Sequence, residues 1–259
     1  MRSIILIMKN TIENKNYHKV YFPKFLKPKK NFLLKRLGKD NDGGYLVDIN
    51  SLRTANTLVS LGINDDWSFE LDAQKENKNI NIVCYDLSTS FIFLFKIFIK
   101  KLFFIFFYGI KETISSFAKI YSYFFFLKSK IFLKKITYND LIIITKKLKP
   151  PFFLKIDIEG SEYRILDDLL KLQNKISGIV IEFHDIDLFQ DKIKDFVSKF
   201  KLELIHIHAN NCNILWHEAN VIELSFSKNP VIIGAMINLP HKHDHKNLKG
   251  FPEISIKFR

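Results

Sequence analysis

Short apolar runs alternate with stretches of helical periodicity along this chain from residue 57 onward. Each run has the length of a buried strand, and the stretches between them have the length of helices. The predicted strands are Thr57–Leu61, Ile80–Tyr85, Phe152–Ile158, Gly178–Phe183, Leu202–Ala209 and Val221–Phe226, and the predicted helices are Ser68–Glu76, Glu162–Leu172 and Phe189–Phe200. This alternation predicts an α/β fold with a mainly parallel sheet, helices on both faces and ligands at the carboxyl ends of the strands.

The 259 residues suit one α/β domain better than two. Residues 1–35 carry no clear periodicity, so we predict an irregular leader followed by one domain over residues 36–259. The apolar run Ile4–Met8 is too short for a secretory segment, and the two cysteines, Cys84 and Cys212, form no C-x-x-C pair. We therefore expect a cytoplasmic protein.

A densely aromatic segment, Phe91–Phe126, interrupts the alternation as part of an insertion over residues 91–135. Its longest uncharged run, Leu102–Ile110, is far shorter than the roughly 20 residues that a spanning helix needs. On helical spacing Lys96 and Lys100 share one face, which leaves a broad apolar surface. That surface suits either burial against the domain, which we favour, or peripheral contact with the inner face of a membrane.

The formal net charge of +13 raises the question of a nucleic-acid partner, because clustered cations bind phosphate by releasing counterions. Nearly all the cations are lysines, however, and arginine is the side chain suited to forked phosphate contacts. The arginines are Arg2, Arg36, Arg53, Arg164 and Arg259. We therefore expect no nucleic-acid partner, and a small-molecule or glycan ligand instead.

The segment Leu154–Glu162 delivers carboxylates to the end of a buried strand, just before a glycine that begins the next helix. Because side chains alternate along a strand, Lys155, Asp157 and Glu159 share one face. Burying charge is expensive unless the charge is paired or used. These residues therefore form either a functional site or an ion pair that stabilises the strand and caps the helix.

At this point the chain resembles the FkbM-type methyltransferases, which carry a Lys-Ile-Asp, hydrophobic, Glu-Gly segment at the end of their fourth strand. The resemblance spans roughly residues 36–226 apart from the aromatic insertion, through the segments Asp42–Tyr45, Ser60–Glu70, Glu182–His184 and His206–Asn211. It implies a class I methyltransferase that uses S-adenosylmethionine and has a Rossmann-like, mainly parallel seven-stranded sheet. Ser60 stands where many relatives carry an acid.

The turn after the first predicted strand contains one glycine, Gly62, which allows a sharp turn and close approach of a ligand to the backbone. A dinucleotide site would need G-x-G-x-x-G here, so nicotinamide cofactors are disfavoured. Asp86 ends the second strand, where ribose hydroxyls bind in such folds, although it also suits a capped turn. The expected cofactor-binding residues are Asp42, Gly62, Asn64, Glu70, Asp86 and Asp157.

Methyl transfer to a hydroxyl group benefits from a base with a pKa near neutral. His184 follows the fifth predicted strand on the same face as Glu182, so we predict it as the base, with Asp157 as the rival. His206 and His208 share the face of a later strand that leads into Asn210 and Asn211. The expected acceptor-binding residues are Glu159, Glu182, His208 and Asn210.

A divalent cation held by Asp157, Glu159, His184 and Asp185 is an alternative that we do not favour, because no spacing requires it. The run His241–His245 also suggests a metal, but we interpret it as a flexible surface loop.

We expect an S-adenosylmethionine-dependent O-methyltransferase, and the resemblance suggests a saccharide hydroxyl of a surface-glycan precursor as the acceptor. Two alternatives remain: a membrane-associated Rossmann enzyme that uses a nucleotide sugar, and a catalytically degenerate methyltransferase fold that serves as a scaffold.

Overall fold

The central element of the structure is a seven-stranded sheet. The computed structural model describes residues 17–128, 130–212, 214–215, 218–237 and 239–259. The sheet has the order β10-β13-β9-β8-β5-β6-β7. Its strands are β5 (Thr57–Leu61), β6 (Asn81–Asp86), β7 (Ile131–Leu133), β8 (Phe152–Ile156), β9 (Ile176–Phe183), β10 (Glu203–Ala209) and β13 (Ile222–Ser227).

Only β13 runs antiparallel to its neighbours in this sheet, and it pairs with β9 on one side and β10 on the other. The remaining neighbours pair in parallel. The mainly parallel sheet predicted from the sequence is therefore confirmed, with one reversed strand. The short strand β7, which the sequence analysis did not predict, completes the edge next to β6.

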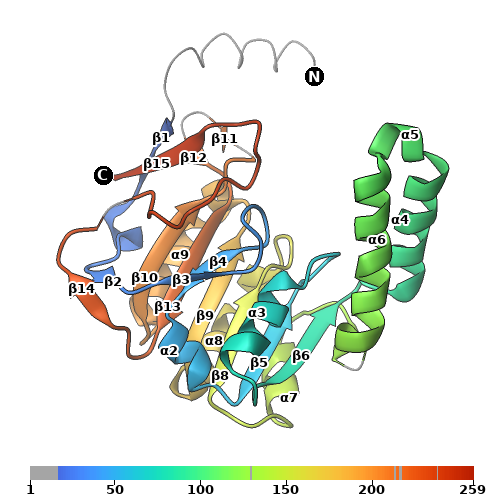
Figure 1. Cartoon of the computed structure of the whole chain (residues 1–259). Coiled ribbons are helices and arrows are strands. Elements are labelled where there is room, and N and C mark those ends of the chain that lie inside the picture. Colours follow the sequence, from blue (N-terminus) through green and yellow to red (C-terminus); the bar gives the residue numbers. More distant parts are fainter. Residues whose placement is uncertain (1–16, 129, 213, 216–217, 238) are drawn as a thin grey trace.

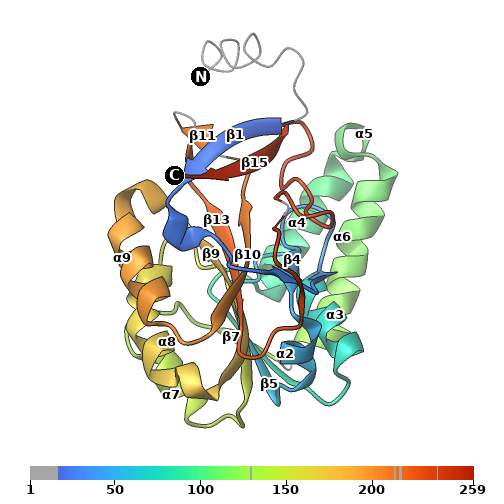
Figure 2. The same ribbon diagram turned by 90° about the vertical axis from the view of Figure 1, so that its left-hand side faces the viewer.

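Helices cover both faces of the sheet (Figure 2). On one face lie α7 (Asp140–Thr145), α8 (Leu166–Leu172) and α9 (Ile186–Lys199), and on the other lie α2 (Ile49–Arg53) and α3 (Ser68–Glu76). Short turns of 3-10 helix are η1 (Lys24–Leu26), η3 (Glu162–Arg164) and η4 (Gln173–Lys175). The predicted helix over residues 162–172 is thus split into η3 and α8.

A hydrophobic core lies on each face of the sheet, and β8 contributes side chains to both, because its side chains alternate between the two faces. Leu154 and Ile156 are buried with α7, α8 and α9, whereas Phe153 is buried with α2 and α3. Lys155 lies on the Phe153 face by the same alternation, with 3% of its surface exposed. A charged side chain is thereby directed into the sheet interior, where it needs a partner.

The predicted irregular leader is wrong for residues 17–35, whereas residues 1–16 lie outside the described part of the chain. β1 (Tyr17–Phe22) pairs in parallel with β15 (Glu253–Phe258). Val20 and Phe22 are buried in the main core. The remaining short strands are β2 (Asn31–Phe32), paired with β14 (Ile232–Gly234), β3 (Lys35–Leu37), paired with β4 (Tyr45–Val47), and β11 (Ile214–Leu215), paired with β12 (Glu218–Ala219).

The aromatic insertion forms a helical hairpin that stands apart from the domain (Figure 1). It consists of α4 (Phe91–Phe103), α5 (Ile105–Tyr108) and α6 (Ile110–Ser122), followed by the π-helical turn η2 (Tyr123–Leu127). The favoured prediction of burial against the domain holds only at its base, where η2 joins the core; along α4 the only buried residue is Leu94. Among the described residues, no helix is long and apolar enough to cross a membrane.

The C-terminal segment is fixed to β10 by buried histidine and carboxylate pairs. His206 Nε2 lies 2.8 Å from Asp244 Oδ1, so the run His241–His245 is anchored to the sheet at Asp244. Lys242, His243 and His245 are exposed, in agreement with the predicted surface loop. His208 lies 3.3 Å from both Glu223 Oε2 and Glu253 Oε1. Burial alone would lower the pKa of His208, but Glu223 and Glu253 raise it well above its ordinary value.

We expect His208→Asn to destabilise the protein by about 1–3 kcal/mol near pH 6, since two buried carboxylates lose their cation. A raised folded-state pKa contributes stability that is fully present below the unfolded value of about 6.5 and is lost as pH rises through the folded value. The difference in melting temperature between wild type and variant should therefore shrink as the pH rises from about 6.5 through the raised pKa of His208. A difference that stays constant with pH would contradict a protonated His208.

Candidate active site

A cavity of about 460 Å³ opens at the carboxyl ends of β5, β6 and β8. This is where the sequence predicts ligand binding. Of the expected site residues, those that line the cavity are Asp42, Gly62, Asn64, Asp86, Asp157 and Glu159. The lining also includes residues that the sequence analysis did not assign to the site, among them Lys39, Asp65, Asp66, Tyr85, Leu87, Ser88, Lys134, Lys135, Ile136, Lys155 and Ser161.

Asp86 joins the turns that follow β5 and β6. Its Oδ2 accepts hydrogen bonds from the backbone N–H groups of Ile63 (2.9 Å) and Asn64 (2.8 Å). Its Oδ1 accepts from Ser88 and Thr89. Burial alone would raise the pKa of Asp86, but these hydrogen bonds lower it, so the carboxylate is charged at neutral pH. Asp86 thus fixes one wall of the cavity, and ribose binding by its oxygens stays a prediction.

Gly62 brings the end of β5 against the end of β8. Its φ is +77°, and a Cβ added there would lie 1.6 Å from the carbonyl oxygen of Asp157. Lys155 Nζ donates a hydrogen bond of 2.8 Å to the carbonyl oxygen of Gly62. The glycine is required here by the backbone of the neighbouring strand, before any ligand is considered.

Glu70 lies behind the cavity and does not line it. Its side chain is fully buried, accepts a short hydrogen bond from Ser60 Oγ and lies 3.9 Å from Lys155 Nζ. Burial raises the pKa of Glu70, and Lys155 opposes that rise. The predicted cofactor contact by Glu70 is therefore replaced in this structure by a supporting role, in which it neutralises Lys155 beneath the Gly62 turn.

Of the four described residues other than glycine with positive φ, three lie at the carboxyl ends of strands, and the fourth, Asn139, precedes α7. Asn64 (φ 45°) follows β5, Glu159 (φ 52°) follows β8 and Asp185 (φ 49°) follows β9. This left-handed conformation is uncommon outside glycine, and strained backbone of this kind is concentrated at functional sites. Strain therefore marks the same edge of the sheet as the cavity.

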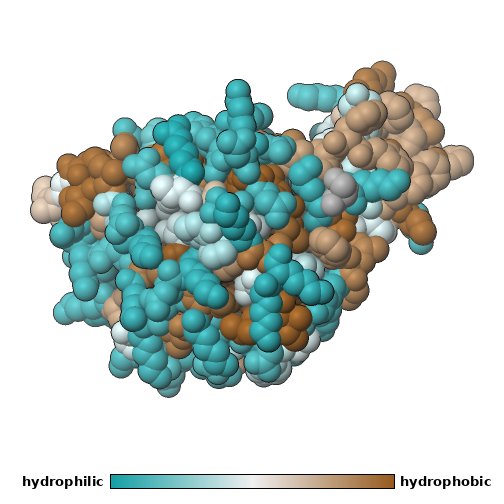
Figure 3. All heavy atoms as spheres, turned by 90° about the horizontal axis from the view of Figure 1, so that it is seen from below, coloured by the Kyte–Doolittle hydropathy of each residue, from teal (hydrophilic) through white to brown (hydrophobic). Residues whose placement is uncertain are grey.

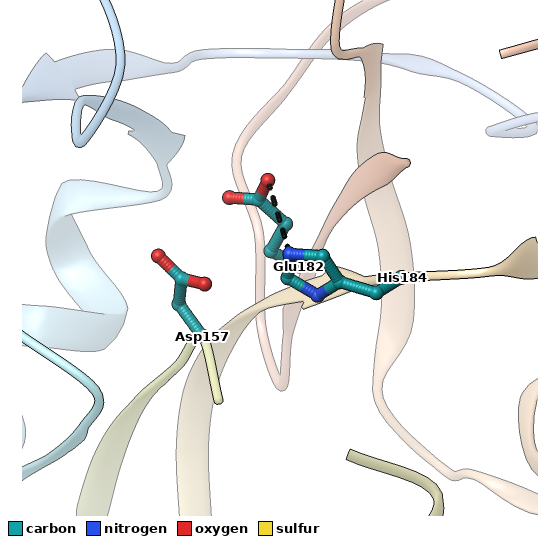
Figure 4. Close-up of side chains that lie close together, drawn as sticks. All are labelled: Asp157, Glu182 and His184. Carbon is teal, nitrogen blue, oxygen red and sulfur yellow. Dashed lines mark ion pairs between the residues drawn. The ribbon is translucent and has the colours of Figure 1, made fainter. Parts of the chain in front are cut away.

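Asp157, Glu182 and His184 lie together at this edge (Figure 4), with one ligand atom from each within 4.8 Å of the others. Among the described residues this is the group whose atoms suit a metal ion. Tyr45 Oη lies 3.1 Å from both Asp157 Oδ2 and Glu182 Oε2, and Asn210 Nδ2 donates to Glu182 Oε1 at 3.1 Å. The sequence analysis placed these three residues at the same edge of the sheet. It gave Tyr45 no role in the site, although Tyr45 ends the Asp-Gly-Gly-Tyr motif.

The electrostatics of this cluster separate the two candidate bases. Burial raises the pKa of Asp157 to about 6, because the effect of burial outweighs that of the Lys155 charge. Burial would lower the pKa of His184, but its hydrogen bond to Glu162 and the nearby carboxylates raise it to about 9. At neutral pH His184 therefore holds a proton, whereas Asp157 can accept one. Asp157 also lines the cavity, and His184 does not.

The remaining expected residues lie away from the cavity lining. His208 is buried between Glu223 and Glu253, and Asn210 is buried against Glu182. In this conformation neither side chain reaches the cavity directly. Asn210 still contributes indirectly, because it fixes the carboxylate of Glu182 next to Asp157.

Residues 103–208 match the family model of the methyltransferase FkbM domain. The match begins inside the aromatic insertion and includes Asp157, Glu182 and His184, but it does not reach the Gly62 turn or Asp86. The resemblance recognised in the sequence is confirmed over this range, and the first two strands of the domain are identified by their place in the sheet.

Two solved methyltransferase structures are similar to the chain at low identity. The precorrin-6y C5,15-methyltransferase from Geobacter metallireducens GS-15 is 11% identical with a TM-score of 0.37, over 70% of this chain and 86% of that one. The O-methyltransferase from Bacillus cereus in complex with SAH is 8% identical with a TM-score of 0.36, over 69% of this chain and 76% of that one. No curated protein matches significantly. The Rossmann-like methyltransferase fold follows from the strand order, in which β7-β6-β5-β8-β9 reproduces the order 3-2-1-4-5.

Proposed function

We propose that the chain is an FkbM-type, S-adenosylmethionine-dependent O-methyltransferase whose acceptor is a saccharide hydroxyl of a surface-glycan precursor. The observation that carries the proposal is the charge of the cavity lining, which contains six carboxylates and four lysines although the chain as a whole is strongly basic. An excess of carboxylates favours a cationic ligand with a sulfonium and an amino group. It disfavours the diphosphate of a nucleotide sugar.

The lining also offers a place for each part of this cofactor. Asp86 lies at the end of β6, where the ribose would bind, and Tyr85, Leu87 and Ile136 supply apolar surface beside it for the adenine. S-adenosylmethionine supplies an electrophilic methyl group when bound. Alignment of that group with the acceptor carries much of the rate enhancement in such a reaction, so the rigid turns at Gly62 and Asp86 are central to the mechanism.

Asp157 is the residue that we assign as the base. Its carboxylate faces the cavity, and its raised pKa suits proton uptake from a hydroxyl near neutral pH. Tyr45 holds one of its oxygens, while protonated His184 supplies positive charge behind it. The Tyr45 hydroxyl can donate to Asp157 while Asn210 donates to Glu182, and the proposal assigns no step to a metal ion.

Titration calorimetry with S-adenosylmethionine, S-adenosylhomocysteine and a uridine diphosphate sugar tests the cofactor class. We expect the two adenosyl compounds to bind and Asp86→Ala to weaken that binding, whereas the exposed variant Leu188→Ala should bind like wild type. Binding of the nucleotide sugar alone would establish the rival enzyme, and binding of none of them by folded protein would support a scaffold. Once cofactor binding is established, incubation of the protein with methyl-labelled S-adenosylmethionine and a panel of saccharides tests the acceptor. If no saccharide becomes labelled, the saccharide part of the proposal is refuted and the cofactor part stands.

Asp157→Asn should reduce kcat by about 10²- to 10⁴-fold while cofactor binding persists, because the amide cannot accept the proton. In wild type, kcat/KM should rise with pH through a midpoint of about 6, as Asp157 loses its proton. Steady-state rates across pH provide the measurement, with His184→Gln as the comparison. If His184→Gln abolished the rise and Asp157→Asn kept it, the assignment of the base would be reversed. Rates that collapse with a chelator and recover with Mg²⁺ would instead favour the metal alternative.

A further inference from the structure

The tip of the α4–α6 hairpin exposes a group of large apolar side chains that the rest of the described chain does not cover. Phe106 is 98% exposed and Phe107 87%. The tip consists of Leu102, Phe103, Phe104, Phe106, Phe107, Tyr108 and Ile110. Hydrophobic atoms also dominate the part of the hairpin that projects from the domain in Figure 3. Contiguous apolar surface of this kind marks an interaction site.

The hairpin is held together by its own contacts, so the tip is displayed by a formed element. Phe98 of α4 packs on Phe117 of α6 with ring centroids 5.7 Å apart. Lys101 Nζ lies 3.3 Å from Glu112 Oε2 between the same helices, and Thr113 is buried between them. The inward faces of α4 and α6 are therefore already occupied, and the tip side chains point to the outside.

The hairpin is also strongly basic. Between residues 91 and 128 the sequence has six lysines and a single acid, Glu112. Lys100 and Lys111, at the end of α4 and the start of α6, are exposed and make no ion pair with another described residue. Aromatic side chains at the tip can insert into the apolar part of a bilayer, while the flanking lysines are attracted to anionic headgroups.

We propose that the tip inserts into the surface of an anionic lipid bilayer, with Lys100 and Lys111 at the level of the headgroups. The 13 residues of α4 are about 20 Å long, short of the roughly 30 Å of a hydrocarbon core, so the hairpin enters the interface without crossing it. A second copy of the chain fits less well, because a symmetric contact between tips would bring the same lysines together.

The base of the hairpin is joined to the cavity wall. Lys119 of α6 forms a close ion pair with Asp65, which lines the cavity, and Trp67 Nε1 donates to Ser122 Oγ at 2.8 Å. On the other side, α4 begins directly after the turn that Asp86 holds. Insertion of the tip would therefore hold the cavity near the membrane, at a distance set by the length of the hairpin, whichever acceptor the domain uses.

Sedimentation of the full chain with vesicles tests this proposal. One set of vesicles consists of phosphatidylcholine alone, and the other is an equimolar mixture of phosphatidylcholine and phosphatidylglycerol. Wild type should bind the anionic vesicles, and Phe106→Ser/Phe107→Ser should weaken the partition coefficient by at least about tenfold. Lys100→Gln/Lys111→Gln should weaken it by about 25-fold on anionic vesicles, about fivefold per lysine, with little change on neutral ones.

Leu188→Ser/Ile233→Ser removes two exposed apolar side chains elsewhere, which are 73% and 55% exposed, and should bind like wild type. Thermal unfolding verifies that all the variants are folded, which we expect because the substituted side chains are exposed. Wild type that stays in the supernatant with anionic vesicles would overturn the proposal, as would tip variants that bind like wild type. If light scattering shows that wild type is a dimer and the tip variants are monomers, and neither binds vesicles, the surface would be assigned to a second copy of the chain.

Discussion

Gly62→Ala is expected to abolish measurable binding of S-adenosylhomocysteine and to lower the free energy of unfolding by about 4 kcal/mol or more. The new Cβ would lie 1.6 Å from the carbonyl oxygen of Asp157, and this oxygen belongs to the backbone of the adjoining strand. A flexible side chain could move aside, but here the ends of β5 and β8 must separate. That movement displaces Lys155 from the Gly62 carbonyl and distorts the cavity wall. Calorimetry and chemical denaturation measure the two effects.

Gly109→Ala is the matched control for this substitution. Gly109 also has a left-handed φ, +82°, but a Cβ there would meet no atom within 4 Å. It should therefore carry only the conformational cost of about 1–3 kcal/mol and leave cofactor binding unchanged. Equal losses in the two variants would mean that the backbone angle, and not the close approach of β8, makes glycine necessary at residue 62. Unchanged cofactor binding by Gly62→Ala would remove this turn from the proposed site.

The local pattern of the sequence was sufficient to predict the strands that carry the site. Residues 57–61 and 152–156 are short apolar runs ending in turn residues, and both form strands in the expected places. Both Gly62 and Asp157 were assigned to the carboxyl ends of parallel strands, and the structure places them against each other because β5 and β8 are neighbours. The aromatic insertion was recognised as an interruption for the same reason: it breaks the alternation.

The parts that were missed depend on contacts between residues far apart in the sequence. β1 pairs with β15 at the other end of the described chain, and no local periodicity indicates such a partner. Tyr45 gained its role only when the fold placed its hydroxyl between Asp157 and Glu182. Whether the apolar hairpin packed on the domain or projected from it could not be decided from periodicity, since both arrangements need the same spacing.

Lys155→Met should lower the free energy of unfolding by about 3–5 kcal/mol, because it leaves Glu70 buried without its cation. The two side chains are 4% and 0% exposed, so little solvent screens the loss. The carbonyl oxygen of Gly62 also loses its donor, so cofactor binding should weaken as well. A drop of roughly 10 °C in melting temperature is expected for a domain of this size. Lys75→Met makes the same substitution in the exposed pair with Asp72 and should cost less than about 1 kcal/mol.

A double-mutant cycle with Glu70→Gln separates the charge pair from the packing of the lysine stem. Glutamine keeps an oxygen that accepts from the hydroxyl of Ser60 but carries no charge. It therefore removes the unpaired buried charge that Lys155→Met leaves on Glu70. The double variant should therefore be more stable than the sum of the single losses by about 1–3 kcal/mol. Strict additivity would show that Lys155 acts mainly through its stem and its bond to Gly62. A favourable coupling would establish that Glu70 of α3, which accepts a hydrogen bond from Ser60, supplies a carboxylate beneath the Gly62 turn, where β5 itself has none.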